Sequence, residues 1–267
     1  MELNVKEIWE YKDLLFLLVK RDFTTFYKQT VLGPLWFFIQ PFITTIIFSL
    51  VFTKIANIGT DKVPPFLFYL SGIIAWNYFS TCLISTSNTF LANANLFNKV
   101  YFPRLIIPIS LVFSALAKFG IQFLMFLILY TYLVFKDALP FNLNFNIIVI
   151  LPLIIFQMAM IGQGMGMIIA SLTSKYRDLS HLVNFGTQLL MYISPVIYPL
   201  SSVPEFYKKL IFMNPMTPVI EIFRFTLFKT GEISLSMISL SIFSTIFIFL
   251  LGLLVFNKVE KTFIDTI

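Results

Sequence analysis

The chain has 267 residues, of which 58% are hydrophobic and only 12% charged, and its formal net charge is +6. Soluble domains carry about 25% charged residues, so this composition excludes an ordinary water-soluble enzyme. In so apolar a chain the surplus of Lys and Arg favours the cytoplasmic side of a membrane over nucleic-acid binding. The one cysteine, Cys82, excludes a disulfide within the chain.

Residues 3 to 27 interleave apolar side chains with Lys, Glu and Asp. This pattern predicts an amphipathic helix lying in the membrane interface, with its Lys side chains at the level of the lipid headgroups. A soluble cytoplasmic helix is the alternative. A signal peptide is not indicated, because the apolar stretch from Leu14 to Val19 has six residues and an h-region needs at least about seven.

Five runs of 25 or more residues contain no Asp, Glu, Lys or Arg, and a sixth apolar segment is interrupted only by Lys118. A helix crosses about 30 Å of hydrocarbon with about 20 apolar residues, so these segments predict membrane spans. We expect six, at about Leu35–Phe52, Phe66–Thr86, the stretch between Arg104 and Lys136, Ile147–Leu172, Leu182–Tyr198 and Ile233–Phe256.

The segment Pro204–Phe228 is apolar but carries two further prolines and several charges. It is too broken to span, and it predicts short re-entrant helices that dip into the outer leaflet, where irregular backbone must be covered by protein or water. The expected fold is an all-α integral membrane protein. Its parts are an interface helix with lead-in (1–33), a six-span domain (34–257) and a tail (258–267).

The distribution of Lys and Arg sets the expected orientation. With the N-terminus inside, the cytoplasmic segments hold 11 of these residues and the outer segments hold 7. By the positive-inside rule both termini are therefore expected in the cytoplasm.

No motif for catalysis or metal binding occurs in the sequence. It has no P-loop, no H-E-x-x-H and no cluster of Cys and His, so we expect no catalytic residues, no metal site and no cofactor in this chain. His181 is expected to be a solvated loop residue. Lys118 and Gln122 lie one helical turn apart within a span, where a charge must face a partner, a cavity or the interface, or else snorkel.

Small residues recur in the fourth expected span. Gly162, Gly166 and Ala170 are spaced by four, which predicts a face where helices approach closely, within one subunit rather than at a dimer seam. Gly164 lies off this face and is expected to add flexibility.

Three stretches of the sequence together resemble one family. They are Lys20–Asp22 with Phe26–Trp36; Asn95–Arg104; and Tyr176–Leu179 followed by Ser194–Pro199 and Asn214–Met216. In this order and spacing they are similar to the permease subunits of polysaccharide-exporting ABC transporters, which move O-antigen, teichoic acid or capsule polymer. The resemblance covers nearly the whole chain.

This resemblance implies a bacterial inner-membrane subunit that works as a homodimer with two separate ATPase subunits. ATP and Mg would be bound by those partners, and the substrate would be a polysaccharide on a polyprenyl diphosphate lipid. Two other readings are weaker. A drug or small-lipid exporter does not fit the motif around Tyr101–Arg104, and a polyprenyl-phosphate sugar transferase would need clustered acidic and basic residues.

On the cytoplasmic side the resemblance implies a coupling helix at about Ala92–Arg104 that docks in the ATPase. The residues expected to couple are Asn95, Leu96, Phe97, Lys99, Tyr101 and Arg104. Arg suits bidentate contact with a diphosphate, so Arg21 is expected either to recruit the lipid headgroup or to anchor on anionic lipid. The full headgroup set is Lys20, Arg21, Tyr27 and Lys28.

The remaining expected residues belong to the channel and to its outer end. Sugars bind on aromatic faces, and the first and fifth spans line the channel in the resembling exporters. The expected lining residues are Trp36, Phe37, Phe42, Gln188 and Tyr192. The outer gate is expected at Glu205, Glu221 and Arg224.

Overall fold

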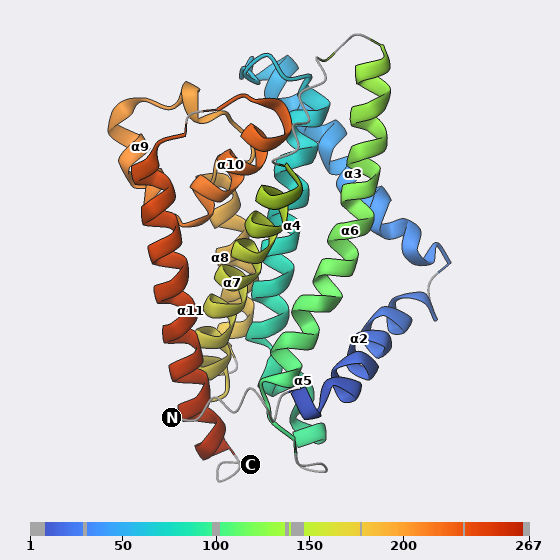
Figure 1. The fold of residues 1–267 in the computed structure, drawn as a ribbon, viewed down its shortest axis with the longest axis vertical. Helices are drawn as coiled ribbons and strands as arrows, with labels where there is room; N and C mark the ends of the chain where they lie inside the picture. The colour runs from blue at the N-terminus through green and yellow to red at the C-terminus, as the bar shows by residue number, and fades with distance from the viewer. Residues whose placement is uncertain are drawn as a thin grey trace.

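The computed structural model describes residues 9–28, 31–97, 102–136, 139, 147–176, 178–231 and 233–263, and in these ranges all regular structure is helical (Figure 1). The expected all-α class is thereby confirmed. The elements are α2 (Lys12–Tyr27), η1 (Gly33–Leu35), α3 (Trp36–Phe48), η2 (Ser49–Ile55), α4 (Pro65–Ser87), α5 (Thr89–Phe97), α6 (Ile106–Phe135), α7 (Ile147–Thr173), α8 (Leu179–Ile193), η3 (Leu200–Ser202), α9 (Glu205–Phe212), α10 (Met216–Phe228) and α11 (Leu235–Phe263).

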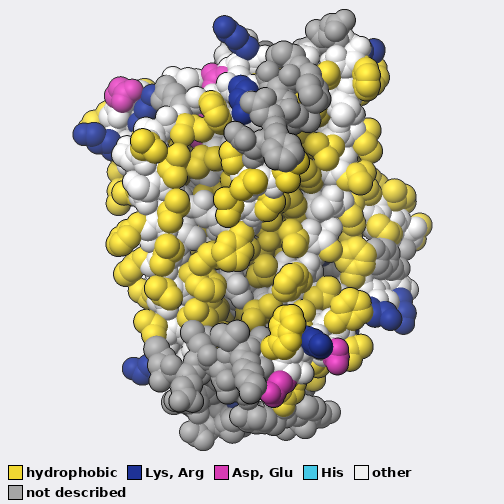
Figure 2. Space-filling view, in the orientation of Figure 1, with side chains coloured by type: hydrophobic (Ala, Val, Ile, Leu, Met, Phe, Trp, Pro, Cys, Tyr) yellow, Lys and Arg dark blue, Asp and Glu magenta, His cyan; other side chains and the backbone are white. Residues whose placement is uncertain are grey.

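Five of the described helices are long and apolar enough to cross a membrane. They lie at Gly33–Ile55, Pro65–Ser87, Ile106–Phe135, Ile147–Thr173 and Leu235–Val259, so five of the six expected spans are matched. On the face shown in Figure 2, hydrophobic side chains cover the middle, and the charged side chains lie toward the two ends. This distribution is the one that a bilayer requires.

The fifth expected span, Leu182–Tyr198, is shorter in the structure. α8 has 15 residues, which span about 22 Å, less than the ~30 Å hydrocarbon core. It ends because Pro195 disfavours helical backbone in the residue before it, and Ser194 accordingly adopts an extended conformation. Two short helices, α9 and α10, follow in the region where short helices were expected.

α4 is the central helix of the bundle. In its most apolar 18-residue stretch 78% of the residues are buried, because α6, α7, α3, α8 and α10 all pack against it. It begins at Pro65, a residue favoured in the first helical turn. Large side chains on several of its faces, including Tyr69, Trp76 and Phe79, lie in the core.

The glycines of α7 make close contact with α4, as the spacing predicts. A Cβ at Gly162 would lie 2.8 Å from the Cys82 Cβ, and one at Gly166 would lie 2.6 Å from the Thr86 Cβ. The small-residue face is therefore a seam within one chain.

The expectation that Gly164 adds flexibility is wrong. A Cβ there would lie 2.8 Å from the Phe249 Cα of α11, and Gly252 of α11 faces the Gly164 carbonyl directly. α7 thus presents glycines to α4 on one side and to α11 on the other. Gly164 therefore lets the backbones of α7 and α11 pack in direct contact.

The first span, formed by η1, α3 and η2, is the least covered by the rest of the chain. Only 11% of its most apolar stretch is buried. Its outer part, Ser49–Ile55, is π-helical, which the sequence did not indicate; such segments often occur at functional sites. There the Thr53 hydroxyl lies 3.2 Å from the Tyr69 hydroxyl of α4.

The bundle has two distinct ends (Figure 1). α2, α5 and the C-terminal part of α11 lie at one, which we call the α5 end. α9, α10 and the start of α4 lie at the other, which we call the α9 end.

Candidate transport site and its two ends

At the α5 end, the amphipathic helix α2 packs against α6. Its Leu18 is buried with Phe102, Ile106 and Ile107, while its opposite side exposes Phe16 together with charged residues. A helix with an exposed face of this mixed kind is suited to the membrane interface. Residues 1–8 of the expected interface helix lie outside the described residues.

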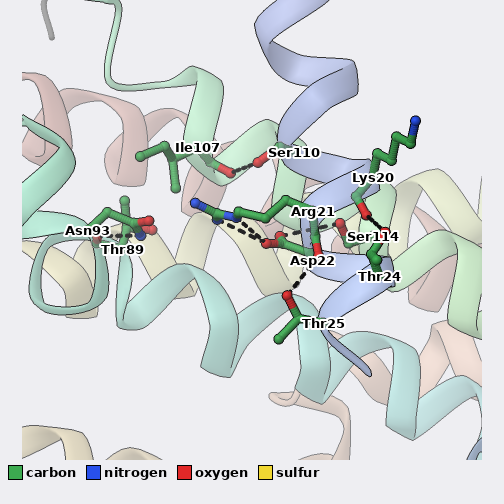
Figure 3. A network of polar contacts seen from close by, with 10 residues as sticks. All are labelled: Lys20, Arg21, Asp22, Thr24, Thr25, Thr89, Asn93, Ile107, Ser110 and Ser114. Atoms are coloured by element: carbon green, nitrogen blue, oxygen red, sulfur yellow. Dashed lines mark hydrogen bonds and ion pairs between the residues drawn. The ribbon is translucent and has the colours of Figure 1, made fainter. Parts of the chain in front are cut away.

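A polar network joins α2 to α6 (Figure 3). Arg21 donates two hydrogen bonds to Oδ1 of Asp22, from Nε at 3.0 Å and from Nη2 at 2.9 Å. The other carboxylate oxygen, Oδ2, accepts a hydrogen bond from the Ser114 hydroxyl of α6 at 3.5 Å. The Asp22 side chain is 17% exposed and that of Arg21 50% exposed. Asp22 therefore points toward the bundle, and Arg21 lies at its surface.

Lys118 lies on the same side of α6, one helical turn beyond Ser114. Its Nζ is 5.8 Å from the centre of the Phe37 ring of α3, and the negative charge of Asp22 acts on it. The Phe37 ring in turn lies 6.3 Å from the ring of Phe23 in α2. Lys118 thus faces the region between α2, α3 and α6, with a carboxylate as charge partner.

The expected headgroup residues lie on the exposed side of this network. Lys20, Arg21 and Lys28 are exposed on α2 or directly after it. Tyr27 is the last residue of α2, and its side chain lies outside the described part of the chain. Three cations therefore line one edge of the helix.

The expected coupling segment begins with α5, which is kinked at Asn93. Phe97 points into the bundle, with ring centres 6.0 Å from Phe90 and 5.8 Å from Phe102, and the Arg104 guanidinium lies 5.2 Å from its ring. Phe97 therefore packs against two clusters of buried side chains, one that includes Leu18 of α2 and one that includes Phe256 of α11. Leu96, next to Phe97, is half-buried. The side chain of Asn95, and all of Lys99 and Tyr101, lie outside the described residues.

The expected channel residues divide between an exposed and a covered set. On α3, Trp36 and Phe42 are 50% and 40% exposed, whereas Phe37 faces α2 and α6. On α8, Gln188 and Tyr192 are exposed. Asn184, one turn before Gln188, extends this stripe.

A similar polar position occurs on α3, where Gln40 is exposed one turn after Trp36. Both α3 and α8 pack against α4 with one side and leave the other uncovered. Each uncovered face combines aromatic rings with primary amides, groups that can contact both the apolar faces and the hydroxyls of a sugar.

At the α9 end, the three expected gate residues differ in environment. Glu205 is exposed at the start of α9, 3.1 Å from the Lys208 Nζ. Glu221 and Arg224 of α10 are both 2% exposed and lie inside the protein. The Arg224 guanidinium donates hydrogen bonds to the carbonyl oxygens of Pro195 and Val196, directly after α8.

A chain of hydrogen bonds also crosses this end. The Gln157 amide of α7 donates to the Ser241 hydroxyl of α11 at 2.8 Å, and Ser241 donates to the Pro215 carbonyl at 3.0 Å. Asn214 donates to the Ser194 hydroxyl at 2.7 Å and accepts from the backbone of Met216, the first residue of α10. The start of α10 is thereby joined to three helices.

Sequence reasoning did not assign a role to Asp22 or Ser114, nor to the carbonyls of Pro195 and Val196. The signal for Asp22 was its place directly after Lys20 and Arg21, where a carboxylate can neutralise a neighbouring cation. Backbone carbonyls leave no signal in side-chain patterns. Arg224 could only have been matched to them through the helix break that Pro195 causes.

Comparison with known proteins places the chain among transporters. Residues 13–228 match the family model described as ABC-2 type transporter. The chain is 28% identical to the O-antigen export system permease protein RfbA of Klebsiella pneumoniae over 253 residues, 95% of this chain and 94% of that protein. It is 27% identical to the protein of the same name from Myxococcus xanthus, over 79% of each chain. The polysialic acid transport protein KpsM of Escherichia coli is 24% identical, over 93% of this chain and 94% of its own length.

Proposed function

This chain belongs to the ABC-2 type transporter family, and we propose that it is the membrane-spanning subunit of an ATP-driven exporter of lipid-linked polysaccharide. The names of its relatives, an O-antigen permease and a polysialic acid transporter, support a polysaccharide as the cargo class. An O-antigen-like polymer on a polyprenyl diphosphate is the first choice, and capsule polymer or teichoic acid is the alternative.

The observation that carries the proposal is the stripe Asn184, Gln188 and Tyr192 on the exposed side of α8. Polar side chains inside a membrane normally face the bundle interior or a water-filled cavity, yet a single copy of this chain leaves them uncovered. The equally uncovered face of α3 carries Trp36 and Gln40. A second copy that closes against these two faces would enclose a channel lined by amides and aromatic rings.

The topology of the proposed subunit has six crossings. α8 and the extended segment after it form the fifth, because the backbone beyond Ile193 finds partners inside the protein and need not continue as a helix. Both termini lie in the cytoplasm, on the side of the α5 end. α9 and α10 then lie in the outer leaflet and cover the outer opening.

Two roles follow for the cytoplasmic end. Since the sequence has no P-loop, ATP and Mg bind to two separate ATPase subunits, and α5 with the segment to Arg104 docks on them. Lys20, Arg21 and Lys28 either receive the diphosphate headgroup or anchor α2 on anionic lipid. Asp22 provides a counter-charge for Arg21 while no headgroup is bound.

The experiment is co-expression of this chain with an ABC-type ATPase subunit from the same genome, followed by native mass spectrometry and an export assay. We expect two copies of each subunit and ATP-dependent transfer of lipid-linked glycan across proteoliposome membranes. A stable, ATP-responsive complex with one copy of this chain would contradict the dimer. A complex that moves small lipids but no lipid-linked glycan would contradict the proposed cargo.

A further inference from the structure

We infer that Arg224 is a positioning residue that fixes the end of α8 against α4 and α10, so that one buried guanidinium sets the outer width of the channel. This inference rests on the proposed function, because the width matters only if the chain lines a channel. The contacts themselves hold whatever the cargo is.

The backbone after α8 needs hydrogen-bond partners. With the helix ended at Ile193, the carbonyls of Pro195 and Val196 have no helical partner, and unsatisfied backbone groups at membrane depth cost several kcal/mol each. Arg224 donates from Nη1 to Pro195 and from Nη2 to Val196, the latter at 2.7 Å. The planar fork of a guanidinium can hold two adjacent carbonyls at once, whereas the ammonium of Lys acts as a point donor.

α4 leaves the space that the Arg224 guanidinium occupies. A Cβ at Gly72 would lie 2.7 Å from the Arg224 Nη2 and 3.0 Å from the Val196 carbonyl oxygen. One turn earlier, the Phe68 ring centre lies 3.7 Å from the guanidinium carbon, within the range of a cation–π contact. On α4, Gly72 therefore leaves space for the guanidinium, and Phe68 covers one face of it.

The buried charge of Arg224 has acidic partners. Arg224 is 2% exposed, and a buried charge is stable only when it is paired and hydrogen-bonded. Glu221, one turn earlier on α10, places Oε1 3.8 Å from Nη1. The charge of Asp61 in the α3–α4 connection also acts on Arg224, and this carboxylate accepts a 2.7 Å hydrogen bond from Ser201.

The same part of α4 also contacts the first span. Tyr69, next to Phe68 on α4, lies 6.3 Å from the ring of Phe52, and its hydroxyl contacts Thr53 in the π-helical segment η2. The outer ends of the first span and of α8, both proposed to line the channel, are thus attached to α4 within one turn of the Arg224 guanidinium. A shift of α10 at Arg224 would displace the end of α8 relative to α3.

A direct role of Arg224 in binding cargo does not fit this geometry. Its guanidinium is enclosed by Phe68, Gly72 and the carbonyls, and it has no exposed edge to offer a sugar or a phosphate. Arg224 therefore affects export by holding the end of α8 in position.

The test measures that position. Nitroxide labels at Ile193→Cys at the end of α8 and Leu124→Cys on α6, both exposed sites, report the distance between the two helices in the purified complex; the native Cys82 is buried. Arg224→Lys keeps the charge but loses the fork, Arg224→Met loses both, and Gly72→Ala presses on the fork without changing it. Lys209→Met is the control, because it removes an exposed cation from α9.

We expect Arg224→Lys, Arg224→Met and Gly72→Ala each to broaden or shift the distance distribution. Export should fall by roughly 2- to 30-fold at matched protein levels, the range of coupling changes in such networks. The Lys209→Met control should match the wild type in both measurements. A wild-type distribution in Arg224→Lys would overturn the inference, since charge alone would then suffice.

Two further outcomes keep the inference and the proposed function apart. If the Arg224 variants fail to assemble, Gly72→Ala decides: a wild-type distribution in that variant overturns the inference, and a changed one supports it. If the wild-type complex exports no glycan but the distances still change, the proposed cargo is wrong and the positioning role stands.

Discussion

The contact between α7 and α11 gives a quantitative prediction through Gly164→Ala. A Cβ at this position would lie 2.8 Å from the Phe249 Cα and 3.0 Å from the Ile248 carbonyl oxygen. Both are backbone atoms, so no side chain can rotate away, and the helices must separate to restore an ordinary contact. Overpacking of this kind costs about 1–3 kcal/mol.

The same chain offers a matched control in Gly120→Ala. Gly120 lies on α6, and a Cβ at this position would meet nothing within 4 Å. Both substitutions gain the same helix propensity, about 1 kcal/mol, so the difference between the two variants isolates the clash. We therefore expect Gly164→Ala to be less stable than Gly120→Ala by about 1–3 kcal/mol, a factor of roughly 5 to 150 in the folded-to-unfolded ratio.

The assay is denaturation of the purified chain in detergent, by heating or by titration with sodium dodecyl sulfate, followed by circular dichroism. Gly120→Ala should unfold at or above the wild-type midpoint, and Gly164→Ala should unfold below Gly120→Ala. Equal midpoints for the two alanine variants would refute the claim that α7 and α11 meet backbone to backbone.

Three more predictions address other parts of the molecule. Gln157→Leu removes two hydrogen bonds to α11, and at about 0.6 kcal/mol each in a membrane the same denaturation assay should show a loss of ~1 kcal/mol; an unchanged midpoint would contradict this. Arg21→Ala should lower export at matched protein levels, and Arg21→Lys should restore it only if Arg21 serves as a lipid anchor and not as a bidentate diphosphate ligand; equal export by wild type and Arg21→Ala would exclude both roles. Phe97→Ala should cost about 2–3 kcal/mol, below the value for a fully buried Phe, and weaken stimulation of the ATPase by this chain; retention of both in Phe97→Ala would show that α5 does not depend on this ring.

Much of the fold could be predicted because a bilayer constrains sequence strongly. Long charge-free runs allow few structures, and the expected bounds Ile147–Leu172 differ from α7 by one residue. Prolines were used unevenly: the break at Pro64 and Pro65 located the start of α4, whereas the expected span Leu182–Tyr198 ran through Pro195, before which α8 ends. These features follow from local chemistry, which the sequence displays directly.

Pairwise relations between helices could not be predicted in the same way. The spacing of Gly162 and Gly166 indicated a close-packed face, but nothing in it distinguished Gly164 as the contact with α11. The π-helical segment Ser49–Ile55 has no sequence signal, since its backbone geometry depends on packing against α4.

Charged residues showed the same limit. Arg224 was expected at the gate, and its sequence context gave no sign that it would be buried against two carbonyls. Such a role depends on a helix break some 30 residues earlier, at Pro195. For Arg224, the sequence gave no information on which groups its guanidinium contacts.

The glycine seams of α7 have a practical consequence for experiments on motion. With α7 in backbone contact with α4 on one side and α11 on the other, these three helices form an internal reference frame for the subunit. Probes on the exposed side of α11 should therefore keep constant distances to probes on α4 throughout the ATP cycle. Structures of the subunit in different states can therefore be superposed on α4, α7 and α11.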